Sequence, residues 1–179
     1  KLNPNVPEIH TNFSYALLLN NEYLQGWLEH EYRSKKKQSP SNPHAKPKIQ
    51  KWEGEELKAG EKLLIVSEQG FGDSIQFMRY IPYLLTQGLD VSFCAQSKLH
   101  SLIKDANIHV NPLTSEEANL VSSGKWTPLL SVPRYLKVSP ENPIISKKYI
   151  HPNKSLLEKW RNILSTQKRP IIGINWQGN

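Results

Sequence analysis

The sequence is poor in the residues that build disulfide-bonded or metal-bound scaffolds. It contains a single cysteine, Cys94, which excludes an internal disulfide and any multi-cysteine metal site. Its six histidines show no ligand spacing, so no metal is expected. No apolar run approaches the roughly 18–20 residues that a membrane-spanning helix needs, and no signal-peptide pattern opens the chain. These absences predict a cytoplasmic location and no membrane span.

Both ends of the sequence look incomplete. The chain begins at Lys1 rather than at a methionine, and it ends at Asn179 directly after an apolar stretch. Hydrophobic residues make up 37% of its 179 residues, which is enough for the core of one ordinary domain. We therefore expect one complete domain with attachments, truncated from a longer protein.

The chain is basic, with 23 Lys and Arg against 16 Asp and Glu and a formal net charge of +7. Such a balance first suggests nucleic acid as a partner. Much of the excess, however, lies between Ser34 and Lys51, a stretch rich in lysine and proline and poor in apolar residues. This composition is typical of a solvated linker, and contact with an anionic surface is the alternative. No aromatic-basic interleaving or zinc-finger spacing is present, so no specific nucleic-acid partner is expected.

Composition divides the chain into unlike segments. In order, they are a helical hairpin (1–34), a basic linker (35–60), an α/β lobe (61–150) and a helix–strand pair (151–179). The hairpin is predicted from two runs of helical period separated by Asn20 and Asn21, which favour a turn. Trp52 is an unusual residue for a free linker, so we expect it to pack back onto the lobe.

The segment 61–150 alternates strand and helix signals. Residues 63–66 form a continuous apolar run typical of a strand buried on both faces, and further strands are predicted at 91–95, 108–110 and 129–132. Between them, helices are predicted from Asp73 to Gly88, over 97–105, and within 115–124. Pro82 should kink or split the first of these helices. Strands separated by helices predict a parallel, Rossmann-like sheet.

The segment 151–179 continues this alternation. Residues 153–166 place four large apolar side chains at helical spacing on one face: Leu156, Leu157, Trp160 and Ile163. Residues 170–176 then read as a buried strand. We expect this strand to open a second lobe that the chain does not contain.

The loop after the first predicted strand is the most informative segment. It reads Gln69-Gly70-Phe71-Gly72-Asp73 and lies where the carboxyl edge of a parallel sheet binds ligands. Its two glycines would let the backbone approach a ligand closely. The third glycine of the dinucleotide fingerprint is replaced by Ile75, so the Gly-x-Gly pattern alone is a weak motif.

Several side chains at this edge are candidates for chemistry. Asp73 has two open interpretations: an N-cap that accepts backbone N–H groups, or a general base aimed into a cleft. Gln69 either reaches an acceptor or makes a hydrogen bond within the loop. Ser131 and Arg134 follow the last predicted strand at the same sheet edge, so we expect them to line the cleft.

Taken together, the motifs resemble bacterial tetratricopeptide-repeat proteins that end in a glycosyltransferase domain related to the family 9 heptosyltransferases. The resemblance covers nearly the whole chain. Its most specific match runs from Glu68 to Phe77 and continues with Arg79, Tyr80 and Pro82. The weaker matches, in order, are 12–33 (the last repeat), 52–60 (the lead-in), 129–134 and 173–179.

This resemblance implies a two-lobed, GT-B type glycosyltransferase that inverts the sugar and needs no metal or other cofactor. Asp73 matches the proposed base of related heptosyltransferases, and Gln69, Gly70, Phe71 and Gly72 would contact substrate beside it. The donor would be a nucleotide-sugar bound mostly on the second lobe, and the acceptor is unknown. The fragment alone is therefore expected to be inactive. Two departures are Phe71, where a smaller aliphatic is common, and the single hairpin, from which a protein partner of the repeats cannot be identified.

Two other functions remain open. The chain is alternatively a tetratricopeptide-type interaction module with a degenerate glycosyltransferase-like lobe, in which the hairpin supplies the partner surface. A nucleotide-binding Rossmann domain of another class is a weaker alternative, because the third glycine is missing.

Overall fold

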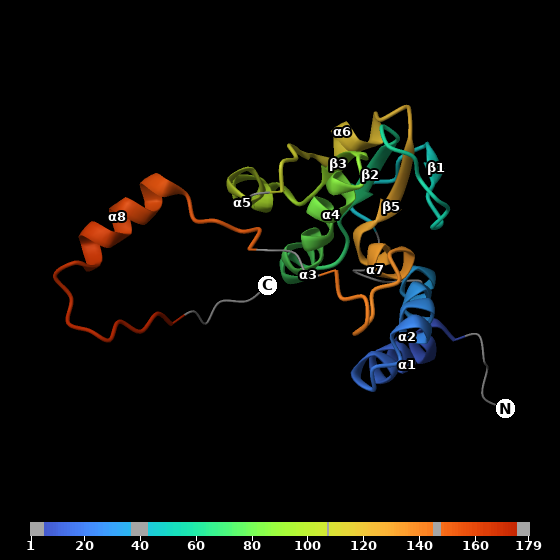
Figure 1. The fold of residues 1–179 in the computed structure, drawn as a ribbon, viewed down its shortest axis with the longest axis horizontal. Helices are drawn as coiled ribbons and strands as arrows, with labels where there is room; N and C mark the ends of the chain where they lie inside the picture. Colours follow the sequence, from blue (N-terminus) through green and yellow to red (C-terminus); the bar gives the residue numbers. More distant parts are fainter. Residues whose placement is uncertain (1–5, 37–42, 107, 145–147, 175–179) are drawn as a thin grey trace.

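The centre of the molecule is a parallel five-stranded sheet (Figure 1). The computed structural model describes residues 6–36, 43–106, 108–144 and 148–174. The strands are β1 (Gln50–Lys51), β2 (Lys62–Val66), β3 (Asp90–Cys94), β4 (Pro112–Leu113) and β5 (Lys125–Pro128). They lie in the order β1-β5-β2-β3-β4, and every neighbouring pair is parallel. The mixed α/β class with a parallel sheet is thus confirmed, and the arrangement is compatible with a Rossmann-like fold.

Two of the expected strands lie elsewhere along the sequence. The expected strand at 108–110 is absent, and β4 pairs with β3 two residues further on, because His109 has a positive φ of 53° that interrupts an extended chain. The expected strand at 129–132 is also wrong, since β5 ends at Pro128. Residues Leu129–Ser131 instead form a 3-10 turn that leads into α7 (Val132–Tyr135). The apolar residues of this segment indicate that it is buried. A buried segment can be either a strand or a short helix, so its apolar character does not distinguish the two.

Short helices connect the strands and cover the sheet. Between β2 and β3 lie α3 (Phe71–Phe77), a 3-10 turn and α4 (Ile81–Thr86). Pro82 stands in the first turn of α4, so the predicted split at this proline is confirmed. The later connections contain α5 (His100–Asp105) and α6 (Ser115–Asn119), which begins with a Thr114–Glu117 capping box.

Alternating side chains of β2 enter two separate cores. Leu63 and Ile65 are fully buried in the larger cluster, which includes Ile81 of α4. Leu64 and Val66 point to the other face and pack with Ala118 of α6. Both faces of the strand are therefore covered, which is why it reads as a continuous apolar run. Cys94 lies in the second cluster, and burial raises the pKa of its thiol to about 11, which disfavours the reactive thiolate.

The N-terminal residues form the predicted helical hairpin. Helix α1 (Pro7–Leu19) and helix α2 (Tyr23–His30) are joined by a turn in which Asn21 has a φ of 64°. Gly26 allows their close approach, because a Cβ there would lie 2.8 Å from the Leu18 side chain. The hairpin does not stand alone: α2 packs against α7 of the lobe (Figure 1).

The described part of the predicted linker is bound to the sheet. Its residues 50–51 form β1 beside β5, and the backbone N–H of Trp52 donates to the Trp126 carbonyl at 2.7 Å. Trp52 is 5% exposed, so its predicted packing onto the lobe is confirmed. Lys46 and Lys48 remain solvated, as expected, but Ala45 and Pro47, which alternate with them, are buried. The exposed lysines correctly indicated that one side of this segment faces solvent. They gave no sign that residues 50–51 form an edge strand of the sheet.

The helix–strand pair is partly formed. Helix α8 (Lys154–Leu164) is present, lies apart from the sheet in Figure 1, and exposes the whole of its predicted apolar face. Residues 170–174 form no strand, and Ile172 and Ile174 are 79% and 76% exposed; residues 175–179 lie outside the described residues. A strand here would need a neighbouring strand to accept and donate its backbone hydrogen bonds. No helix in the described residues has the length and apolar character to cross a membrane.

Candidate functional site

The loop at the carboxyl end of β2 has the position expected of a ligand-binding loop. Glu68 and Gln69 follow the strand, Gly70 is the N-cap, and α3 begins at Phe71. The helix thus starts two residues earlier than predicted, and Asp73 occupies its third position. Gln69 has a φ of 60°, so the chain turns sharply between strand and helix.

Asp73 is not the N-cap, since Gly70 holds that position, but from the third helical position its carboxylate completes a capping box. Its Oδ2 accepts the Gly70 N–H at 3.1 Å, which ties the carboxylate to the start of the helix. No hydrogen bond from the described residues reaches its Oδ1. The side chain is half-buried, so it combines a fixed position with access to solvent. One oxygen thus fixes the carboxylate, and the other accepts no hydrogen bond from the described residues.

Gln96 is a site residue that the sequence reasoning missed. It follows β3 at the same sheet edge, and its Oε1 accepts the Ser74 hydroxyl at 2.8 Å. Its Nε2 donates to the Gln69 carbonyl at 3.2 Å. Gln96 therefore bridges the two sides of the loop. A polar side chain directly after a predicted strand at the binding edge was the signal that could have identified it.

The two glycines are not demanded by the fold itself. Gly70 has a negative φ of −85°, and a Cβ there would make only an ordinary 3.4 Å contact with Asp73. Gly72 is exposed, with no described atom within 4 Å of a Cβ position. Phe71 between them packs partly on the core, and the ammonium of Lys98 lies 5.7 Å from its ring centroid. The loop is thus open around Gly72 and closed around Phe71.

Ser131 and Arg134 do not form an open cleft wall in this structure. Ser131 is fully buried, and its hydroxyl accepts from Arg33 at 2.9 Å and donates to Glu31 at 3.0 Å. Arg134 is partly exposed, with its Nη1 3.8 Å from Glu31 Oε2. Both residues therefore face the end of the helical hairpin. The prediction that they lie at the sheet edge is reasonable, but it did not anticipate that the hairpin covers that edge.

A buried ion pair joins the hairpin to the loop. Arg33 donates to Glu68 twice, from Nη2 to Oε1 at 2.7 Å and from Nε to Oε2 at 3.2 Å, and both side chains are 1% exposed. The Leu130 N–H also donates to Glu68 Oε1, at 3.1 Å. Three donors facing two oxygens suit an ionised carboxylate at neutral pH.

Burial and charge oppose one another in this pair. Burial raises the pKa of Glu68 above its ordinary value, while the Arg33 guanidinium and the Leu130 N–H work against that rise. Burial also disfavours the charge of Arg33, but the carboxylates of Glu68 and Glu31 outweigh it and raise the pKa of Arg33. Each charge is thus tolerated because the other is present.

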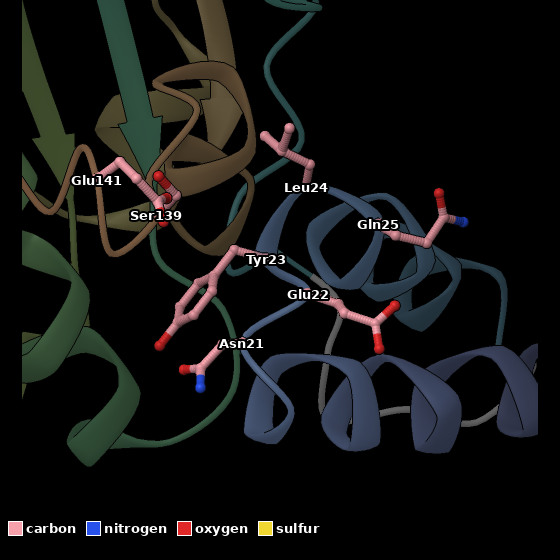
Figure 2. A pocket seen from close by; sticks show the side chains of 7 residues that line it. All are labelled: Asn21, Glu22, Tyr23, Leu24, Gln25, Ser139 and Glu141. Atoms are coloured by element: carbon pink, nitrogen blue, oxygen red, sulfur yellow. The ribbon is translucent and has the colours of Figure 1, made fainter.

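A separate hollow lies at the junction of the hairpin and the lobe. It has a volume of about 340 Å³, and Figure 2 shows the side chains that line it. Its lining comes from the start of α2 and from a loop of the lobe: Asn21, Glu22, Tyr23, Leu24, Gln25, Ser139 and Glu141. None of these residues belongs to the Asp73 loop, so this hollow and the loop are distinct sites.

Within the described residues, no group of three or more His, Cys, Asp or Glu side chains is arranged to hold a metal ion. Comparison with known proteins finds no matching family model, no matching curated protein and no matching solved structure.

Proposed function

We propose that this chain is the N-terminal lobe of a glycosyltransferase, preceded by the end of a tetratricopeptide-type repeat array. Asp73 is its general base. The observation that carries the proposal is the placement of Asp73 at the carboxyl edge of a parallel sheet, with Oδ2 bound to Gly70 and Oδ1 unoccupied by described neighbours. The resemblance of residues 68–77 to family 9 glycosyltransferases supplies the reaction class.

In this proposal the lobe binds the acceptor and Asp73 removes its proton. Oδ1 of Asp73 takes the proton of an acceptor hydroxyl, and the hydroxyl oxygen forms a bond to the anomeric carbon of the donor sugar. The bond between that carbon and the diphosphate oxygen breaks, and the nucleoside diphosphate leaves with the electron pair. Attack from the face opposite the leaving group inverts the anomeric centre. The resemblance to family 9 glycosyltransferases implies that the reaction requires no metal.

A second lobe would complete the enzyme. The exposed apolar face of α8 supports this part of the proposal, since a helix with such a face is stable when a neighbouring element covers it. The nucleotide-sugar would bind mostly on that lobe, so residues 1–179 alone are expected to show no turnover. The cytoplasmic location is part of the same proposal, because nucleotide-sugars are charged, water-soluble donors.

The test compares two aspartates in the complete protein that contains this chain. A panel of nucleotide-sugars is incubated with the protein, and release of nucleoside diphosphate is measured. Asp73→Asn should reduce the rate at least about a hundredfold, because removal of a general base costs on the order of 10²–10⁴. The amide can still accept the Gly70 N–H, so the fold is preserved.

Asp90→Asn is the matched control. Asp90 is exposed at the amino end of β3, at the opposite edge of the sheet, so its replacement should leave the rate unchanged. Full activity in Asp73→Asn would refute the assignment of the base.

A second function is favoured by the surface of the hairpin. Helices α1 and α2 expose six large hydrophobic side chains: Ile9, Phe13, Tyr15, Leu19, Leu24 and Leu28. Such a set on a small element is typical of a protein-binding surface, so the alternative is an interaction module with a degenerate lobe. If the complete protein binds no nucleotide-sugar but retains a peptide partner that Phe13→Ser abolishes, this alternative holds.

A further inference from the structure

The helical hairpin contacts the polypeptide on both sides of the Asp73 loop. Before the loop, Arg33 at the end of the hairpin binds Glu68, which lies two residues after Val66, the buried last residue of β2. After the loop, the Trp27 ring packs edge-on against Phe77, the last residue of α3, with centroids 6.4 Å apart. The hairpin therefore contacts the segment 68–77 at its first residue, Glu68, and at its last residue, Phe77.

The contact before the loop consists of several hydrogen bonds from one buried guanidinium. Arg33 is held by Glu68, Ser131, Glu31 and the His30 carbonyl, and its Nη1 bonds to the last two are 3.0 and 3.1 Å long. The planar guanidinium fixes the direction of the Glu68 carboxylate as well as its distance. A lysine at this position could supply the positive charge, but it could not donate two parallel hydrogen bonds to the two carboxylate oxygens of Glu68.

From Glu68 the connection to Asp73 is short and continuous. Gln69 turns the chain with a positive φ, Gly70 follows as the N-cap, and its N–H binds the Asp73 carboxylate. A change in the backbone dihedral angles of Glu68 moves Gln69 and Gly70. It therefore also moves the Gly70 N–H group that donates to the Asp73 carboxylate. The coupling passes through bonded neighbours and hydrogen bonds, with no long gap to bridge.

We propose that the hairpin positions the Asp73 loop, and that Arg33 is the positioning residue through which it acts. Glu68 belongs to the motif that resembles a catalytic loop, but its carboxylate is buried against Arg33 and serves as the attachment point of the hairpin. The repeat array is thereby part of the active site's support. The positioning of the loop stands on the structure alone, while its consequence for turnover rests on the proposed function.

The first experiment measures the loop without relying on activity. Amide hydrogen exchange is recorded by NMR for Gly70, whose N–H donates to Asp73, and for Phe93 in the interior strand β3. Arg33→Met should accelerate exchange at Gly70 at least about tenfold relative to Phe93, because the loop loses its anchor. The relative exchange rate of Gly70 in Arg33→Lys should lie between those of Arg33→Met and the wild type, since lysine retains the charge and loses the pair of parallel hydrogen bonds.

The matched control lowers the stability of the hairpin but leaves the Arg33–Glu68 ion pair in place. Leu17 is 6% exposed in α1, so Leu17→Ala destabilises the hairpin through its packing alone. It should leave the ratio of Gly70 to Phe93 exchange close to that of the wild type. An equal acceleration in Leu17→Ala and Arg33→Met, or none in either arginine variant, would overturn the proposal. If Arg33→Met does not fold, the exchange rates of Gly70 relative to Phe93 are compared between Arg33→Lys and Leu17→Ala, and the same criterion applies.

The second experiment uses turnover by the complete protein. A displaced base should lower kcat about tenfold to a hundredfold in Arg33→Met and leave the KM for the nucleotide-sugar nearly unchanged, because the donor binds on the other lobe. A rise in KM with kcat unchanged would refute the positioning role. If Asp73→Asn keeps full activity, the proposed function fails, and the exchange experiment still decides whether Arg33 positions the loop.

Discussion

His30 should make the protein sensitive to mild acid, and its replacement should remove part of that sensitivity. The imidazole is 4% exposed at the end of α2, between the rings of Tyr15 and Trp27. Burial, followed by the nearby charges of Arg33 and Lys36, lowers the pKa of His30 to about 3. Among the described residues its Nδ1 has no hydrogen-bond partner, so a proton there would be neither solvated nor paired.

The direction of the effect follows from where the proton binds. In the unfolded chain a histidine has a pKa near 6.5, so the unfolded state takes up a proton as the pH falls below that value. The folded state does not take it up until about pH 3. Stability from His30 is therefore present above pH 6.5 and is lost as the pH falls toward 3. Between pH 7.5 and pH 5.0 the loss is about 2 kcal/mol, at about 1.4 kcal/mol per pH unit below 6.5.

Urea unfolding at pH 7.5 and pH 5.0 measures this loss. His30→Phe keeps an aromatic ring between its neighbours and removes the titration, so its free energy of unfolding should fall about 2 kcal/mol less than that of the wild type. His151→Phe is the control, because His151 is exposed and should give the wild-type pH dependence. The same pH dependence in His30→Phe and the wild type would refute the reasoning, since it would mean that His30 is protonated in the folded protein.

Two further predictions concern the sheet. Gly124 has a φ of 89°, and a Cβ there would lie 2.6 Å from the backbone oxygen of Lys62, so Gly124→Ala should cost at least about 2 kcal/mol in thermal unfolding. Gly60 has a similar φ of 85° with open space around it, so Gly60→Ala should cost about 1 kcal/mol, and equal losses would contradict the steric argument. Cys94 should resist a thiol reagent in the folded protein and react after unfolding in urea; rapid labelling of the native state would show that the second core is open.

Local features could be predicted from the sequence where neighbouring residues determine them. Strand β2 was identified because it is a continuous apolar run buried on both faces, and the hairpin because its apolar residues recur at helical spacing. Pro82 split its helix as expected, since a proline N–H is absent whatever surrounds it. Even Trp52 was identified as ordered, because a large indole is rarely left in water.

The candidate site was predicted only in part. The loop position and the Asp73 cap follow from a strand, a turn and a helix within about ten residues of chain. Gln96 was missed because its partners lie 22 and 27 residues away, across a crossover. Ser131 was assigned to an open edge because nothing in its own segment shows that α2 and Arg33 close that edge.

What the sequence alone determined about this protein is therefore its short-range content: the buried strands, the helical hairpin, the proline break and a glycine-rich loop that ends in an aspartate. Tertiary structure alone decided that a lysine-rich segment supplies an edge strand. It also decided that Arg33 reaches Glu68 and Ser131, at separations of 35 and 98 residues. Such pairings depend on burial. The fold removes both Arg33 and Glu68 from water, and each buried charge is then stabilised mainly by the other.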